Sequence, residues 1–197
     1  MRRRELLTRT GMGGVAAVAG ARALLEPALA SAAETRSDAT ILAQLIQLHQ
    51  VGVLACRAVL ASRELRRSAA RDVRQVLAHE RTHLSALNRE LASLGTQPPA
   101  APADVAAADA LLAAHNVGSR VSSVRSEEEG LQLLLDIERL LTGNYFDAIS
   151  RLQSSALAQR SAEIMASEAQ HAAVLAQLMT PGDFIKIAPT AFVQAKR

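Results

Sequence analysis

The sequence predicts an all-α protein, an antiparallel four-helix bundle with a long crossover between its second and third helices. The 197-residue chain is 49% hydrophobic but only 2% aromatic. Its apolar residues are mainly Ala and Leu, which favour helices. They recur at three- and four-residue steps in four long segments. A β-sandwich of this size would need more aromatic and β-branched residues.

The first two helices are expected over about residues 38–66 and 68–94. Gly95 follows the second helix and is a natural helix stop. Prolines at positions 98, 99 and 102 then interrupt the helical pattern. An Ala-rich piece over residues 103–115 predicts a short helix inside the crossover, and residues 116–125 are polar and turn-like.

The third helix is expected to open at Ser126, because Ser126 and Glu129 match a capping box. Its apolar positions, which include Leu141 and Phe146, are expected to face the core. The fourth helix is expected over about residues 155–179, where Pro-Gly follows. These limits place the bundle at residues 34–180 and an extended C-terminal tail at residues 181–197.

The N-terminal 33 residues have the layout of an export signal. They carry five Arg and two acidic residues, and they include a Gly- and Ala-rich stretch over residues 11–21. The run Arg3-Arg4-Glu5-Leu6-Leu7 resembles a twin-arginine signal. We expect residues 1–33 to be such a signal and the protein to be exported, to the periplasm, cell envelope or beyond. A basic tail or a membrane anchor is the alternative reading, and an uncleaved signal would tether the bundle to the membrane.

The rest of the sequence argues against a nucleic-acid partner and against an internal disulfide. Residues 34–197 hold 17 basic and 17 acidic residues, so the positive charge belongs to the N-terminal segment and no nucleic-acid partner is expected. Cys56 is the single cysteine, which rules out an internal disulfide. We expect Cys56 to be a small buried hydrophobe.

Two Glu-x-x-His pairs are the strongest chemical signal in the sequence. Glu80 with His83 lies in the second predicted helix, and Glu168 with His171 lies in the fourth. Residues three apart share a helix face, so each pair can direct a carboxylate and an imidazole toward one metal ion.

The two halves of the chain repeat this pattern in register. At offsets of 89 or 88 residues, His49, Cys56, Glu80 and His83 correspond to Glu138, Tyr145, Glu168 and His171. Two copies of one helical hairpin would produce this spacing. A pseudo-twofold arrangement of the hairpins would bring the polar residues of all four helices together at mid-bundle.

With these residues, the sequence resembles the ferritin-like superfamily of dimetal bundles over about residues 38–180. Within that superfamily it resembles especially exported bacterial ferritin-like proteins of the kind that includes desiccation-related proteins. The resemblance implies six metal ligands: His49, Glu80, His83, Glu138, Glu168 and His171. His49 stands where the family has a glutamate. It also implies that Glu138 and one of the Glu-x-x-His carboxylates bridge two ions.

The resemblance implies one or two ions of iron or manganese, with oxygen or peroxide reduction coupled to metal oxidation. The added imidazole also suits zinc. A metal-free envelope protein, in which the inward polar residues pair with one another, is the competing interpretation. Iron storage in a shell is disfavoured because nothing resembles a fifth bundle helix after Met179. The sequence leaves open both enzymatic activity and a homo-oligomer.

Several other residues have structural interpretations. His79 and His115 are expected on the surface. Tyr145 is expected to be a packing residue whose hydroxyl finds a partner. The arginine-rich run from Arg63 to Arg74 is expected to form a solvated corner.

Overall fold

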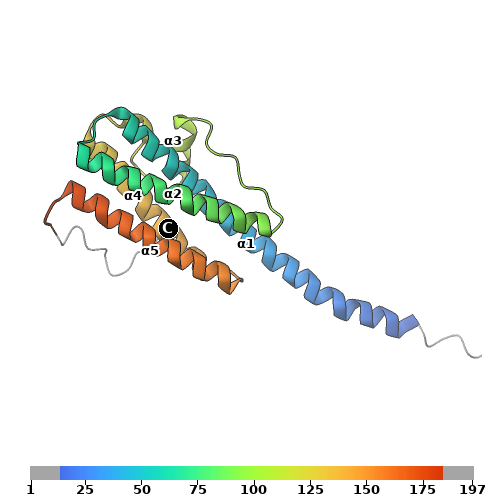
Figure 1. The fold of residues 1–197 in the computed structure, drawn as a ribbon. Helices are drawn as coiled ribbons and strands as arrows, with labels where there is room; N and C mark the ends of the chain where they lie inside the picture. Colours follow the sequence, from blue (N-terminus) through green and yellow to red (C-terminus); the bar gives the residue numbers. More distant parts are fainter. Residues whose placement is uncertain (1–13, 184–197) are drawn as a thin grey trace, which may run out of the picture.

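Four long helices form the bundle, which confirms the predicted fold class (Figure 1). They are α1 (Gly14–Ser62), α2 (Arg67–Ser93), α4 (Glu127–Ile149) and α5 (Ser155–Met179). The crossover between α2 and α4 contains α3 (Val105–Ala114) and the 3-10 turn η1 (Val121–Ser123). The computed structural model describes the backbone of residues 14–183 and the side chains of Ser31 and residues 33–183. No strand occurs in that part of the chain.

α1 begins at Gly14, much earlier than the start near residue 38 that the sequence predicts. The Ala-rich stretch before residue 34 favours helix, so α1 continues beyond the end of the bundle (Figure 1). The paired arginines of the predicted export signal and the C-terminal residues 184–197 lie outside the described residues.

The helix ends follow from local backbone chemistry. Arg63 has a φ of 63°, and α1 ends just before it at Ser62, four residues before the predicted boundary. Gly95, with a φ of 72°, ends α2 as predicted, and the Thr96 amide donates to the Leu91 carbonyl at 3.2 Å. The Ser126 hydroxyl caps α4 by accepting from the Glu129 amide, also as predicted.

Each helix of the bundle runs antiparallel to its neighbours. α1 packs against α2 and α4, and α5 packs against α4 and α2. Contacts at the two ends of the bundle fix these directions. Near one end, the Asp38 carboxylate of α1 accepts from the amides of Gln153 and Ser154 before α5. At the other, Arg66 bonds both the Glu127 carboxylate and the Leu178 carbonyl. The crossover therefore returns the chain along the bundle, so α2 and α4 run in the same direction.

The core is made almost entirely of aliphatic side chains from all four long helices and α3. The segment Ala33–Ser62 of α1 is long and apolar enough to cross a membrane by length and composition, but two thirds of its most apolar window is buried inside the bundle. A close approach of α1 and α4 requires glycine, since a Cβ on Gly130 would lie 2.9 Å from a methyl of Val59. Phe146, expected in the core, is 52% exposed because its neighbour Tyr145 takes the inward direction.

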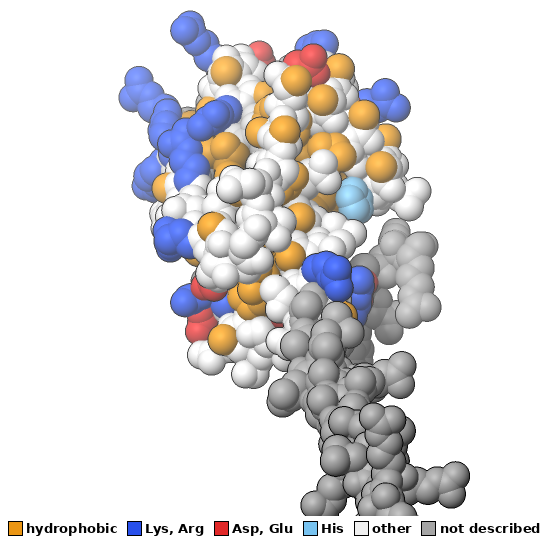
Figure 2. All heavy atoms as spheres, turned by 90° about the vertical axis from the view of Figure 1, so that its right-hand side faces the viewer, with side chains coloured by type: hydrophobic (Ala, Val, Ile, Leu, Met, Phe, Trp, Pro, Cys, Tyr) orange, Lys and Arg blue, Asp and Glu red, His pale blue; other side chains and the backbone are white. Residues whose placement is uncertain are grey.

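On the face drawn in Figure 2, basic side chains gather most densely along one flank and also occur elsewhere around the rim, while small apolar groups are scattered between polar ones. At the corner between α1 and α2 the arginines of the run from Arg63 to Arg74 are exposed, as predicted. Three of them, with Leu60, Leu65 and Ala70, line an open hollow of about 480 Å³. Arg66 bonds to α4 and α5, so the corner between α1 and α2 connects all four long helices.

Replacing Asp38 by Ala should destabilise the bundle by about 1–3 kcal/mol, since two amides in the α4–α5 turn lose their acceptor. Chemical denaturation measures this difference. Asp147→Ala is the matched control, because Asp147 is exposed and its carboxylate holds no such turn. Equal effects of the two substitutions would show that the Asp38 contacts contribute nothing.

Candidate metal centre

Six polar side chains from four helices meet inside the apolar core. α1 and α4 contribute one each, while α2 and α5 contribute two each; they are His49, Glu138, Glu80, His83, Glu168 and His171. Five of them expose 5% or less of their surface, and the His83 side chain is 14% exposed. All six predicted site residues thus lie together, and their use as ligands stays a prediction. Burying such groups costs several kcal/mol per ion unless an opposite charge compensates.

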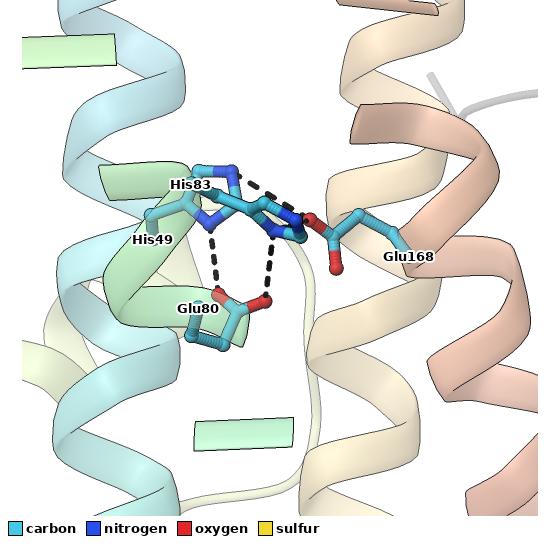
Figure 3. Close-up of side chains that lie close together, drawn as sticks. All are labelled: His49, Glu80, His83 and Glu168. Carbon is cyan, nitrogen blue, oxygen red and sulfur yellow. Dashed lines mark hydrogen bonds and ion pairs between the residues drawn. The ribbon is translucent and has the colours of Figure 1, made fainter. Parts of the chain in front are cut away.

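The three histidines all present the same ring atom, Nδ1, to the carboxylates. His49 Nδ1 lies 2.8 Å from Glu80 Oε2, and His83 Nδ1 lies 2.8 Å from Glu168 Oε1. His171 Nδ1 lies 2.9 Å from the other oxygen of Glu168. Figure 3 shows how the rings from α1 and α2 face these carboxylates. A proton on Nδ1 can occupy each contact, and so can a metal ion with nitrogen and oxygen ligands.

Two of these imidazoles also contact a second side chain through their other ring nitrogen, Nε2. His49 Nε2 lies 2.7 Å from the Tyr145 hydroxyl, the partner that the sequence left unnamed. His171 Nε2 lies 2.9 Å from His79 Nδ1, with the two rings stacked 5.2 Å apart. Metal-binding histidines usually donate their second ring N–H to such an outer partner, which fixes the ring orientation and the tautomer. The arrangement directs both Nδ1 atoms toward the centre.

Three buried atoms at the centre make no hydrogen bond within the described chain: Glu80 Oε1, His83 Nδ1 and Glu168 Oε1. The last two lie 2.8 Å apart and form an ion pair when His83 is protonated. Glu80 Oε1 lies 3.8 Å from the same nitrogen. Leaving a buried polar atom unsatisfied costs about 1–3 kcal/mol. Converging oxygen and nitrogen atoms of this kind fit a divalent metal ion.

The donor atoms form two groups, and within each group all atoms lie within 4.8 Å of one another. One group is His49, Glu80, His83 and Glu168, and the other is Glu80, Glu138, Glu168 and His171. The carboxylates of Glu80 and Glu168 belong to both groups, so both are placed to bridge two ions. Glu138 serves one position, where its Oε2 lies 3.4 Å from His171 Nδ1. That Glu138 bridges two ions stays a prediction.

The buried charges shift one another's pKa values. Burial raises the pKa of Glu138 well above its usual range, and the neighbouring carboxylates of Glu80 and Glu168 raise it further. Burial also acts to raise the pKa of Glu168, but contacts with His171 and His83 outweigh it and hold that pKa well below the usual range. Burial acts to lower the pKa of His83, whereas Glu168 and Glu80 raise it to about 9. The carboxylates therefore attract positive charge to this point.

A glycine on α1 makes room for the Glu80 carboxylate. Gly52 lies one turn after His49, and a Cβ on Gly52 would lie 3.0 Å from Glu80 Oε2. The backbone of α1 therefore approaches the centre closely at this point, while the side chain of His49 enters it from the same helix.

His79 is the functional candidate that sequence reasoning missed. It is exposed as expected, yet it contacts His171 directly. The available signal was its position four residues before His83, which places both imidazoles on one face of α2. His115 is exposed and lies outside the centre, as expected. Cys56 is buried in the apolar core, as expected, and belongs to neither donor group.

A four-helix bundle with carboxylates and Glu-x-x-His pairs at its centre defines a protein of the ferritin-like class. The chain belongs to the ferritin-like domain family, because the sequence model of that family matches residues 28–181. A crystal structure of a conserved hypothetical protein from Mycobacterium tuberculosis has the same fold, with a TM-score of 0.62 and 13% sequence identity. That similarity covers 81% of this chain and 99% of the other. No functionally curated protein matches the sequence.

The metal-free protein should lose stability as the pH rises through about 9. The pKa of folded His83 is about 9, above its ordinary value of 6.5, so its contribution is complete below pH 6.5 and disappears above the folded pKa. We expect a loss of about 1–3 kcal/mol in the free energy of unfolding. Denaturation in the presence of a chelator, from pH 6 to pH 10, measures it.

His83→Gln removes the titrating imidazole and keeps a polar side chain, so its stability should fall less over the same range. If the free energy of unfolding of the wild type and of the variant changed with pH in parallel, His83 would be excluded as the source of the pH dependence.

Proposed function

We propose that this ferritin-like protein binds two adjacent divalent transition-metal ions at the centre of its bundle. The observation that carries the proposal is the convergence of buried carboxylate and imidazole atoms, among them Glu80 Oε1, His83 Nδ1 and Glu168 Oε1, within two overlapping groups of possible ligand atoms. Bound iron or manganese would supply electrons for the reduction of oxygen or peroxide.

The chain's own residues have distinct parts in this proposal. Three carboxylates balance most of the charge of two divalent ions, and Glu80 and Glu168 join the two positions. His83 and His171 each serve one position, and His49 completes the first. The surrounding aliphatic core excludes water, which strengthens every electrostatic contact inside it.

Access from solvent is proposed on the side formed by α2 and α5. His83, on α2, has the most exposed side chain of the six. Its ring stacks on His171 of α5 with the ring centroids 6.0 Å apart, and the ring of exposed His79 also stacks on His171. Ions and small oxidants would reach the centre past these three rings.

Export remains part of the proposal. The arginine pair, the Gly- and Ala-rich stretch and the small residues near position 30 support a twin-arginine signal. That route would deliver a bundle that folds around its metal before transport.

Purified protein loaded with Fe²⁺ or Mn²⁺ without oxygen, and then desalted, should contain about two ions per chain by elemental analysis. Combined His83→Ala and His171→Ala substitutions should reduce this content at least tenfold, because each position loses an imidazole. His115→Ala is the matched control and should keep the full content, since His115 is exposed and outside the centre. Circular dichroism checks that each variant is helical.

A helical wild-type protein that retains no metal after loading would contradict the proposal and favour a metal-free bundle whose inward polar groups pair with one another. Equal metal content in the wild type and the double variant would place the ions elsewhere.

A further inference from the structure

The two groups of ligand atoms are chemically unequal. We call the group of His49, Glu80, His83 and Glu168 the nitrogen-rich position, because it offers two imidazoles and two carboxylates. We call the group of Glu80, Glu138, Glu168 and His171 the oxygen-rich position, because it offers one imidazole and three carboxylates. Since the bridging carboxylates are common to both, the difference is one residue: His49 on one side and Glu138 on the other.

This difference breaks the internal symmetry of the fold. His49 and Glu138 occupy equivalent places in the two helical hairpins, 89 residues apart. The remaining ligands correspond as identical pairs, glutamate with glutamate and histidine with histidine. A glutamate at both places would give two equal positions with one imidazole and three carboxylates each.

The surroundings of His49 place it to act as a ligand. Its side chain is fully buried, its Nδ1 lies 2.8 Å from Glu80 Oε2, and its Nε2 is held by the Tyr145 hydroxyl at 2.7 Å. In the tautomer whose Nε2 proton is donated to Tyr145, the Nδ1 lone pair faces a carboxylate oxygen, and a cation bound by both atoms would relieve their repulsion.

The two positions therefore differ in charge and in donor type. The nitrogen-rich position shares two carboxylates with its neighbour and has none of its own, whereas Glu138 gives the oxygen-rich position a carboxylate that it does not share. Imidazole suits zinc and similar ions, and carboxylate oxygen suits manganese. Divalent zinc also binds such sites more tightly than manganese does, so it takes the position with more nitrogen donors first.

We propose that the centre is a mixed-metal site, with a zinc-like ion at the nitrogen-rich position and manganese or ferrous iron at the oxygen-rich position. This inference rests on the proposed function, because it requires that two ions bind. It makes His49 the residue that sets the metal specificity of one position.

The test supplies the metal-free full-length chain with one equivalent each of Zn²⁺ and Mn²⁺, followed by desalting, elemental analysis and electron paramagnetic resonance. Two Mn²⁺ ions joined by carboxylates couple magnetically, so their spectrum differs from that of an isolated Mn²⁺ ion. The wild type should hold about one ion of each metal per chain, with nearly all of the manganese isolated.

The matched variant is His49→Glu, which gives both positions the same donors. The two metals should then distribute randomly, and about half of the manganese should appear in coupled pairs. His49→Gln is a second variant that avoids adding a buried charge. It should lower zinc affinity at least tenfold and leave the affinity for the first equivalent of Mn²⁺ unchanged.

A wild-type spectrum with the random proportion of coupled pairs would overturn the proposal, as would unchanged zinc affinity in the His49→Gln variant. Retention of only one ion per chain would contradict the two-ion proposed function, and the mixed-metal proposal would fall with it. A wild type that binds neither metal would instead contradict the proposed function itself, which elemental analysis detects separately.

Discussion

Three buried carboxylates at the centre of an aliphatic bundle are the constraint on which the rest of this structure depends. Glu80, Glu138 and Glu168 are each 1% exposed or less. Their mutual repulsion and the loss of hydration would cost several kcal/mol per charge without a compensating cation or proton. The shifted pKa values of Glu138 and His83 are two responses of the metal-free protein to this constraint. A pair of divalent ions would satisfy it more completely.

The scaffold holds the carboxylates in place by ordinary means. Aliphatic side chains pack around them, Gly52 lets α1 approach Glu80, and Gly130 lets α4 approach α1. The Asp38 carboxylate and the Arg66 guanidinium fix the helix directions at opposite ends of the bundle. Because these supports lie on elements remote from one another in sequence, the centre forms only when the whole bundle folds.

Much of this arrangement could be predicted from the sequence, since helical periodicity is a local property. The spacing within each Glu-x-x-His pair places both residues on one helix face, and the repeat between the two hairpins predicts which faces meet. Side-chain detail could not be predicted in this way. The contact of His79 with His171 depends on how closely α2 approaches α5, and the bridging pattern depends on rotamers. Phe146 was expected in the core because its residue type is apolar, whereas the centre requires Tyr145 to face inward and so turns Phe146 outward by about 100°.

A crystal of protein loaded with Mn²⁺ and Zn²⁺, measured with X-rays above and below the absorption edge of each metal, tests the central claim most directly. The account predicts two peaks of anomalous density about 3.5–4 Å apart, both in contact with Glu80 and Glu168. A bundle with intact helices and no anomalous density between these two carboxylates would contradict it.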